Sequence, residues 1–127
     1  MAEHAQIVEI VTPAQAVPDS EVDITVRIKN LYSDPISIMV VGSLEYGEVP
    51  WPNVAFPVNW ATIGPGDVFE FSGWFTMPGS QVTIHAFSLC YGGDGEWHYD
   101  DEMTKVVGVS ASAPQVSEFR IADFAKV

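Results

Sequence analysis

The stretches DVFEFSGWFT (residues 67–76) and QVTIHAFSLCY (residues 81–91) decide the fold class of this 127-residue chain. Both are rich in β-branched and aromatic residues and are bounded by proline and glycine, which is the signature of β-strands. In the first stretch Phe69, Phe71 and Phe75 share one face at a spacing of two, and neither stretch shows helical spacing. We therefore predict two long strands joined by a Met-Pro-Gly-Ser turn.

Other segments have the same character. Residues 21–30 alternate between apolar and polar side chains, which predicts a strand with one buried face and one wet face. Gly-Gly-Asp-Gly at 92–95 predicts a hairpin turn, because such turns need positive φ angles. Further strands are expected at 6–12, 36–46, 60–63 and 96–110. About seven short strands without a helical pattern predict an all-β, immunoglobulin-like antiparallel β-sandwich.

In such a topology the strands at 81–91 and 96–110 form a hairpin, with 36–46 beside them in the same sheet. The strands at 21–30 and 67–76 then belong to the other sheet. Proline at three positions within residues 47–59 excludes a central strand there and predicts a long, stiff loop. We divide the chain into a sandwich at 1–110 and a C-terminal extension at 111–127.

The charge of the chain limits its partners. It carries 17 acidic residues against 5 basic ones, a net charge of −12. No basic patch can be assembled from so few cations, so we expect neither nucleic acid nor an anionic membrane as partner. No apolar run approaches the ~20 residues of a membrane span, and residues 1–6 open no apolar leader. We expect a chain folded in a cytoplasm or cut from a longer precursor.

Few residues suggest chemistry. Cys90 stands alone, so no intrachain disulfide is possible, and a small buried apolar residue is the favoured interpretation. His4, His85 and His98 lack the close spacing of a zinc site. No nucleophile elbow, phosphate loop or dinucleotide fingerprint occurs. The number of acids leaves a glycosidase pair open, although nothing places two carboxylates across a cleft. We expect a non-enzymatic protein without a cofactor.

An acidic cluster lies at and after the predicted hairpin turn. Its five members are Asp94, Glu96, Asp100, Asp101 and Glu102. Carboxylate oxygens suit Ca²⁺, but the spacing matches no EF-hand loop. Strand alternation also sends Asp100 and Asp101 to opposite faces. A solvated acidic rim is the favoured interpretation, and a weak Ca²⁺ site is the alternative.

Four tryptophans, at 51, 60, 74 and 97, are many for this length. Alternation turns Trp74 away from the core, and Trp97 lies just past the hairpin turn. Exposed tryptophans anchor protein interfaces or stack on sugars, whereas buried ones cap the ends of a sandwich. We take Trp51, Trp74 and Trp97 as candidate interface residues.

The C-terminal extension carries its own alternating segment, with Phe119, Ile121 and Phe124 as its large apolar residues. Such a segment either adds a strand to a neighbour's sheet edge or folds back on its own domain. We therefore add these three residues to the candidate interface.

Three motifs together carry a family resemblance. They read P…VP.S.V.ITV.IKN from Pro13, I.PGDVFEFSG.F.MPG from Ile63, and VTIHAFS…GGDGEWHYDDE from Val82. Across roughly residues 6–109 the chain resembles bacterial and phage immunoglobulin-like modules of the CARDB type. The resemblance implies an accessory role in adhesion, spacing or virion decoration, and no active site.

These expectations combine into one leading hypothesis. It is a phage decoration protein that forms homo-oligomers or binds capsid or tail subunits, and that lies on the virion surface after assembly in the host cytoplasm. Assembly in a reducing cytoplasm agrees with the missing disulfide. The alternative is an extracellular adhesion or carbohydrate-binding module that uses exposed tryptophans.

Overall fold

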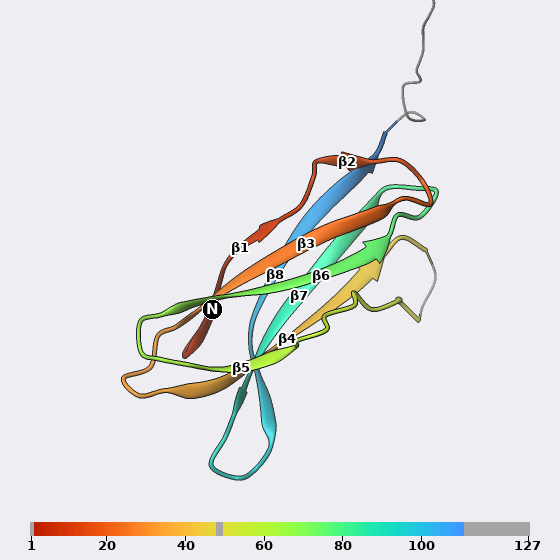
Figure 1. Ribbon diagram of the computed structural model, residues 1–127. Coiled ribbons are helices and arrows are strands. Elements are labelled where there is room, and N and C mark those ends of the chain that lie inside the picture. The colour runs from red at the N-terminus through yellow and green to blue at the C-terminus, as the bar shows by residue number, and fades with distance from the viewer. Residues whose placement is uncertain (1, 48–49, 111–127) are drawn as a thin grey trace, which may run out of the picture.

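The computed structural model describes residues 2–47 and 50–110, and these form eight strands (Figure 1). The strands are β1 (Ala5–Val11), β2 (Gln15–Ala16), β3 (Glu21–Asn30), β4 (Ile36–Glu45), β5 (Trp60–Ile63), β6 (Val68–Thr76), β7 (Val82–Tyr91) and β8 (Trp97–Val109). The described residues contain no α-helix. Within them, therefore, no helix has the length and apolar character needed to cross a membrane.

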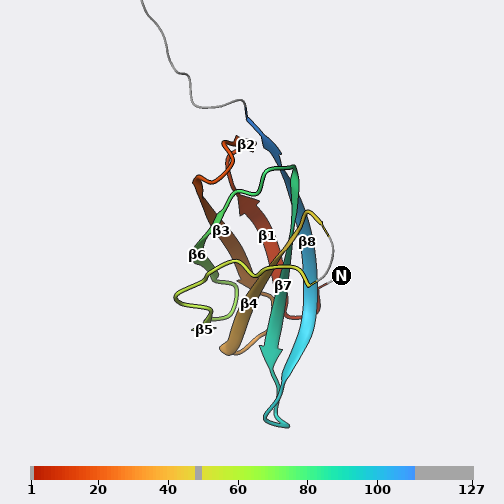
Figure 2. The same cartoon turned by 90° about the vertical axis from the view of Figure 1, so that its right-hand side faces the viewer.

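The strands form two sheets that pack face to face (Figure 2). One sheet has the order β1-β3-β6, and the other has the order β2-β8-β7-β4-β5. All neighbours are antiparallel except β2, which pairs with the end of β8 in parallel. The expected fold class is confirmed, as are the β7–β8 hairpin, the place of β4 beside β7, and the place of β3 and β6 together in the other sheet, where they pair. The β7–β8 hairpin projects beyond the rest of the sandwich (Figure 1).

The core lies between the two sheets and follows the alternation of the sequence. From β3, the side chains of Val22, Ile24, Val26 and Ile28 are at most 2% exposed. The other sheet contributes the inward positions of β4 and β7, among them Ile38, Val40, Val82, Ile84 and Ala86. Every second residue of β4 and β7 therefore faces away from the three-stranded sheet, on the outer side of the five-stranded one.

The proline-rich loop, predicted as a stiff connection, also closes one open side of the sandwich. The N–H of Val54 donates to Gly42 of β4 at 2.9 Å, and Ala55 exchanges two backbone hydrogen bonds of 3.0 Å with Trp74 of β6. The loop thus joins the edges of both sheets. The carbonyl oxygen of Ala55 lies 2.4 Å from where a Cβ on Gly73 would stand, so β6 needs glycine at this point.

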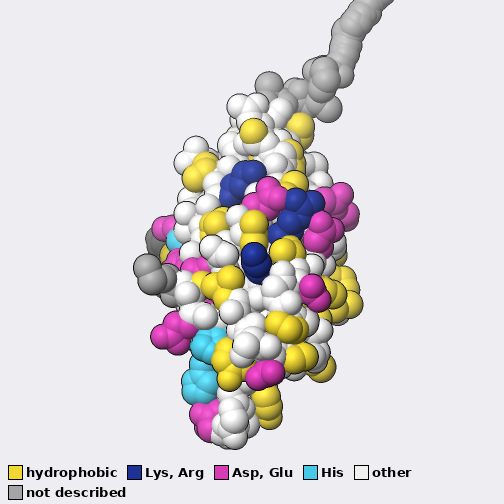
Figure 3. Space-filling view, turned by 90° about the vertical axis from the view of Figure 1, so that its left-hand side faces the viewer, with side chains coloured by type: hydrophobic (Ala, Val, Ile, Leu, Met, Phe, Trp, Pro, Cys, Tyr) yellow, Lys and Arg dark blue, Asp and Glu magenta, His cyan; other side chains and the backbone are white. Residues whose placement is uncertain are grey.

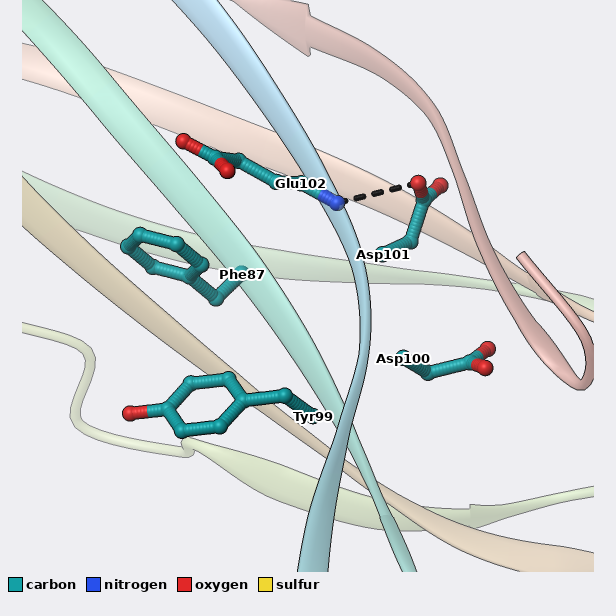
Figure 4. Close-up of a pocket in the computed structure, with 5 residues that line it drawn as sticks. All are labelled: Phe87, Tyr99, Asp100, Asp101 and Glu102. Atoms are coloured by element: carbon teal, nitrogen blue, oxygen red, sulfur yellow. Dashed lines mark hydrogen bonds between the residues drawn. The ribbon is translucent and has the colours of Figure 1, made fainter. Parts of the chain in front are cut away.

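A β-bulge in β8 lies on the opposite side of the sandwich, next to β1. Ser88 of β7 faces Asp101 and Leu89 faces Tyr99, which leaves Asp100 as the extra residue. The bulge turns Asp100 and Asp101 to the same side, while Tyr99 points to the other (Figure 4). The expectation that the two aspartates diverge is therefore wrong, because it assumed an unbroken alternation. An extra residue in one strand disrupts that alternation locally.

Candidate interaction surface on the five-stranded sheet

The outer side of the five-stranded sheet carries a set of aromatic side chains that we call the aromatic face. Its members are Trp60 of β5, Phe87 and Tyr91 of β7, and Trp97 and Tyr99 of β8. Trp60 is 52% exposed, Tyr91 49% and Tyr99 72%. Folding leaves these large rings in contact with water, although burying such rings is favourable. Exposed apolar patches of this kind mark interaction surfaces.

Three residues of this face, together with Ser37 of β4, surround an open hollow of about 340 Å³ next to the β7–β8 hairpin; the three are Trp60, Tyr91 and Trp97. The ring centres of Trp60 and Trp97 are 6.4 Å apart, with their planes inclined by 59°. Those of Tyr91 and Trp97 are 5.1 Å apart and inclined by 67°. The Ser37 hydroxyl is already paired with the Thr62 hydroxyl at 3.1 Å. The hollow is therefore a corner lined mainly by aromatic rings.

His85 lies further along the same outer side and joins three strands. Its Nε2 is 2.7 Å from a Glu45 carboxylate oxygen of β4, and its Nδ1 is 3.3 Å from one of Glu102 of β8. The indole of Trp51 stacks on its ring, with centres 4.9 Å apart. The hydrogen bond to Glu45 raises the pKa of His85, and Glu102 adds to this against the opposing effect of burial. The imidazolium form therefore bridges both glutamates.

The acidic cluster expected after the hairpin turn is divided among several places. Asp94 accepts from the N–H of Glu96 and pairs with His98 at 2.8 Å, and both interactions lower the pKa of Asp94. Glu102 faces His85 on the outer side, whereas Asp100 and Asp101 turn toward β1. The structure does not bring the five carboxylates together as one set of ligands.

Asp100 instead holds the start of the chain. Its carboxylate accepts backbone hydrogen bonds from Glu3, His4 and Ala5 at 3.0, 3.0 and 2.6 Å. Burial acts to raise the pKa of Asp100, but the three N–H donors outweigh it, and the pKa lies below its ordinary value. Side-chain ligand atoms of Glu3, His4 and Asp100 also lie within 4.8 Å of one another. Because both Asp100 oxygens already accept N–H groups, we assign this carboxylate a structural task.

A second hollow, of about 520 Å³, lies where the bulge interrupts β8. Phe87, Tyr99 and Glu102 approach it from the outer side, and the two aspartates approach it from the side of β1 (Figure 4). The rings of Phe87 and Tyr99 meet edge to face, with centres 5.7 Å apart. This hollow extends the aromatic face along β8.

The structure separates the predicted tryptophans. Trp97 belongs to the aromatic face and Trp51 covers His85, but Trp74 is 43% exposed on the outer side of the other sheet. Sequence reasoning did not select Trp60 as an interface residue. Its signal was present, since Ala61 and Ile63 point inward and alternation then turns Trp60 outward. The predicted interface residues Phe119, Ile121 and Phe124 lie outside the described residues.

The described basic side chains lie away from the aromatic face. Arg27 is bonded to Glu9 and Glu70 on the outer side of the three-stranded sheet. The ammonium group of Lys105 donates to the carbonyl of Ile10 in β1 at 3.2 Å. Lysine and arginine side chains accordingly gather in one region of the face in Figure 3, with acidic side chains beside them. The acidic side chains near the aromatic face include Glu45 and Glu102 beside His85, and Asp94 at the hairpin turn.

Two packed sheets with this strand order define an immunoglobulin-like β-sandwich. No family model matches the chain, and no curated protein matches it. Among solved structures it is similar to part of an Escherichia coli alpha-2-macroglobulin spanning domain MG7 to the C-terminus. That match has a TM-score of 0.65 and 19% identity, and it covers 90% of this chain and 18% of the other.

A second similar structure is a CARDB domain from Pyrococcus furiosus, solved in complex with di-metal ions. It matches with a TM-score of 0.58 and 16% identity over 86% of this chain and 91% of that one. A third is an alkylpurine DNA glycosylase from Pseudomonas fluorescens, bound to DNA with an abasic site analog. Its TM-score is 0.61 at 11% identity, over 85% of this chain and 31% of that one.

Identities this low show the fold alone. At that level the CARDB neighbour agrees with the fold that the resemblance seen in the sequence implies. The same architecture occurs in part of a DNA glycosylase chain, so function has to be argued from the surface of this molecule.

Proposed function

We propose that this chain is a non-enzymatic accessory module that attaches to a protein partner through the aromatic face. The observation that carries the proposal is the exposure of Trp60, Tyr91 and Tyr99 on one side of one sheet. Tyrosine and tryptophan are enriched in protein interfaces and dominate their binding energy. The backbone beneath these rings is a paired sheet, so the surface is held rigid before a partner binds.

The finer form of the proposal is a decoration protein of a phage virion or a similar particle, assembled in the host cytoplasm. It is supported by the sequence resemblance, by the single cysteine, and by the acidic charge of −12, which opposes unspecific self-association. The C-terminal extension at 111–127, with Phe119, Ile121 and Phe124, is a second point of attachment in this proposal. Its partners are capsid or tail subunits or other copies of the chain.

Fractionation of the native source material tests the particle assignment. Lysate is separated on a density gradient, and the chain is followed with an antibody. The proposal expects the chain in particle fractions that also contain nucleic acid. A chain confined to cell-wall or soluble fractions contradicts it.

Variants test the attachment itself. A Trp60→Ser/Tyr99→Ser double variant should be lost from the assembly, whereas Trp74→Ser, which changes an exposed ring on the other sheet, should stay attached. A chain ending at Ser112 tests the extension in the same way. Attachment of the double variant at the wild-type level would contradict the role of the aromatic face.

A cell-surface adhesion or carbohydrate-binding module is the second candidate. The observation that favours it is the corner formed by Trp60 and Trp97, because aromatic rings also stack on sugars. Binding on a glycan array that Trp60→Ala removes, with the fold intact, would support it over attachment to a protein.

A further inference from the structure

The hollow at Ser37, Trp60, Tyr91 and Trp97 has a geometry that selects among ligands. Three ring planes meet there at steep inclinations of 59° and 67°, with ring centres 5.1 to 6.4 Å apart. In such a corner one group can contact more than one ring. The negative face of an aromatic ring attracts a cation within about 6 Å of its centre, and tryptophan does so most strongly.

The charges of the molecule also favour a cation as the ligand of this hollow. The chain has a net charge of −12. Arg27 is held by Glu9 and Glu70 on the other sheet, and Lys105 is bonded to β1, so neither competes for this corner. At the adjacent hairpin turn, Asp94 stays ionised because its pKa is lowered by the N–H of Glu96 and by His98. A cation approaching this end of the sheet meets an attractive field.

A neutral sugar suits the hollow less well. Sugar hydroxyl groups need hydrogen-bonding partners when water is removed, and unpaired polar groups are costly to bury. Besides the Ser37 hydroxyl, which is engaged by Thr62, the lining offers the Tyr91 hydroxyl and the indole N–H groups of Trp60 and Trp97. A sugar with several hydroxyl groups exceeds this small set. An alkylammonium group in this open hollow keeps water on its N–H groups while the ring faces attract its charge.

We infer that this corner is a cation–π site for an alkylammonium group, presented by a lysine side chain of the partner protein. The inference rests on the proposed function and adds the chemical group that the partner offers. The four methylene groups of a lysine side chain can lie along an apolar surface while the charged ammonium group stays in contact with water. They would cover the exposed part of Trp60, and the ammonium group would lie against Trp97 and Tyr91.

The indole N–H signals of the full-length chain in a ¹H–¹⁵N NMR spectrum provide the readout. They are followed on addition of N-acetyl-lysine methylamide or choline chloride, at constant ionic strength. Both probes should shift the signals of Trp60 and Trp97 and leave that of Trp74 in place. The neutral isostere of choline, 3,3-dimethylbutan-1-ol, should bind about two- to five-fold more weakly, which is the scale of one cation–π interaction at an exposed site.

Variants connect the signal to the site. Trp60→Ala should weaken choline binding at least about ten-fold, and Trp60→Phe less, because a phenyl face is a weaker partner than an indole face. Trp74→Ala should bind as the wild type does. Trp60 is half exposed, so an unchanged amide spectrum is expected to confirm that its variants fold.

Three results would overturn the inference. Equal binding of choline and its neutral isostere would show an apolar hollow without preference for a cation. Shifts caused by methyl α-glucoside, and not by the cations, would show a sugar site. Binding of choline without binding of the lysine amide would remove the assignment to a lysine side chain. None of these results needs the partner, so the probes can fail while the Trp60→Ser/Tyr99→Ser variant still loses its attachment, and the proposed function then stands.

Discussion

The carboxylate of Asp100 accepts a hydrogen bond of 2.6 Å from the backbone N–H of Ala5. Asp100 belongs to β8 of the five-stranded sheet and Ala5 to β1 of the three-stranded sheet, 95 residues apart in the chain. Asp101 accepts the N–H of Ile7 at 2.9 Å, and the Ser88 hydroxyl donates to the carbonyl of Ala5 at 2.7 Å. Side chains of the five-stranded sheet thus form hydrogen bonds with backbone groups at the edge of the three-stranded sheet. An exposed edge strand could otherwise pair with another chain.

Asp100→Ala should lower the free energy of unfolding by about 1–3 kcal/mol, because three backbone N–H groups lose a charged acceptor. Urea unfolding followed by tryptophan fluorescence measures the change. Glu96→Ala is the matched control, since it removes an exposed carboxylate four residues before Asp100. Equal stability of both variants would show that Asp100 does not hold the N-terminal segment.

Gly73→Ala should destabilise the chain by about 1–3 kcal/mol, the usual cost of overpacking. A Cβ there would stand 2.4 Å from the Ala55 carbonyl oxygen and 2.7 Å from the Phe56 ring, so the loop would have to move away from β6. Gly79→Ala, with no atom within 4 Å, is the control and should change stability little. Thermal unfolding compares the two. A Gly73→Ala protein as stable as the control would contradict the closure of this side by the loop.

The ion pairs of His85 should stabilise the fold more at pH 6 than at pH 8. Its pKa in the folded chain is raised above 6.5, chiefly by Glu45. Such a group contributes fully below its unfolded pKa, and the contribution is lost as the pH rises through the folded pKa. The wild type should therefore lose up to about 1 kcal/mol relative to His85→Gln between these pH values, as for exposed pairs. A stability difference that does not change with pH would contradict the bridge.

Cys90 should react slowly. Burial, with smaller effects from the negative charges of Asp100 and Glu3, raises the pKa of its thiol to about 11. Since the thiolate is the reacting form, labelling by a disulfide reagent at pH 8 should be at least about ten-fold slower in the folded chain than in urea. Equal rates in both conditions would show that the thiol is open to solvent.

Local pattern was sufficient to predict most of the fold. Strict alternation in residues 21–30 predicted which side chains of that strand face the core, and the Gly-Gly-Asp-Gly turn at 92–95 predicted the hairpin. The structure confirms both. The two sheets follow because each strand has one apolar face to bury.

The candidate surface was harder to predict, because it depends on contacts between distant segments. The bulge at Asp100 is defined by its register with Ser88 and Leu89. Nothing in the run Tyr-Asp-Asp-Glu states which residue is extra, and unbroken alternation therefore predicted that Asp100 and Asp101 point to opposite faces. Trp60 became part of an aromatic corner only when β5, β4, β7 and β8 lay side by side. The short strand alone indicated that Trp60 points outward, without naming its neighbours.

Hydroxyl-radical footprinting with mass spectrometry distinguishes an aromatic face that a partner covers from one that stays open to solvent. Oxidation of each aromatic residue is compared between the purified chain and the native assembly that carries it. If a partner covers the aromatic face, Trp60 and Tyr99 should be strongly protected from oxidation in the assembly, and the oxidation of Trp74 should be unchanged. Equal oxidation of Trp60 and Tyr99 in both samples, or protection of Trp74 alone, would contradict coverage of this face by a partner.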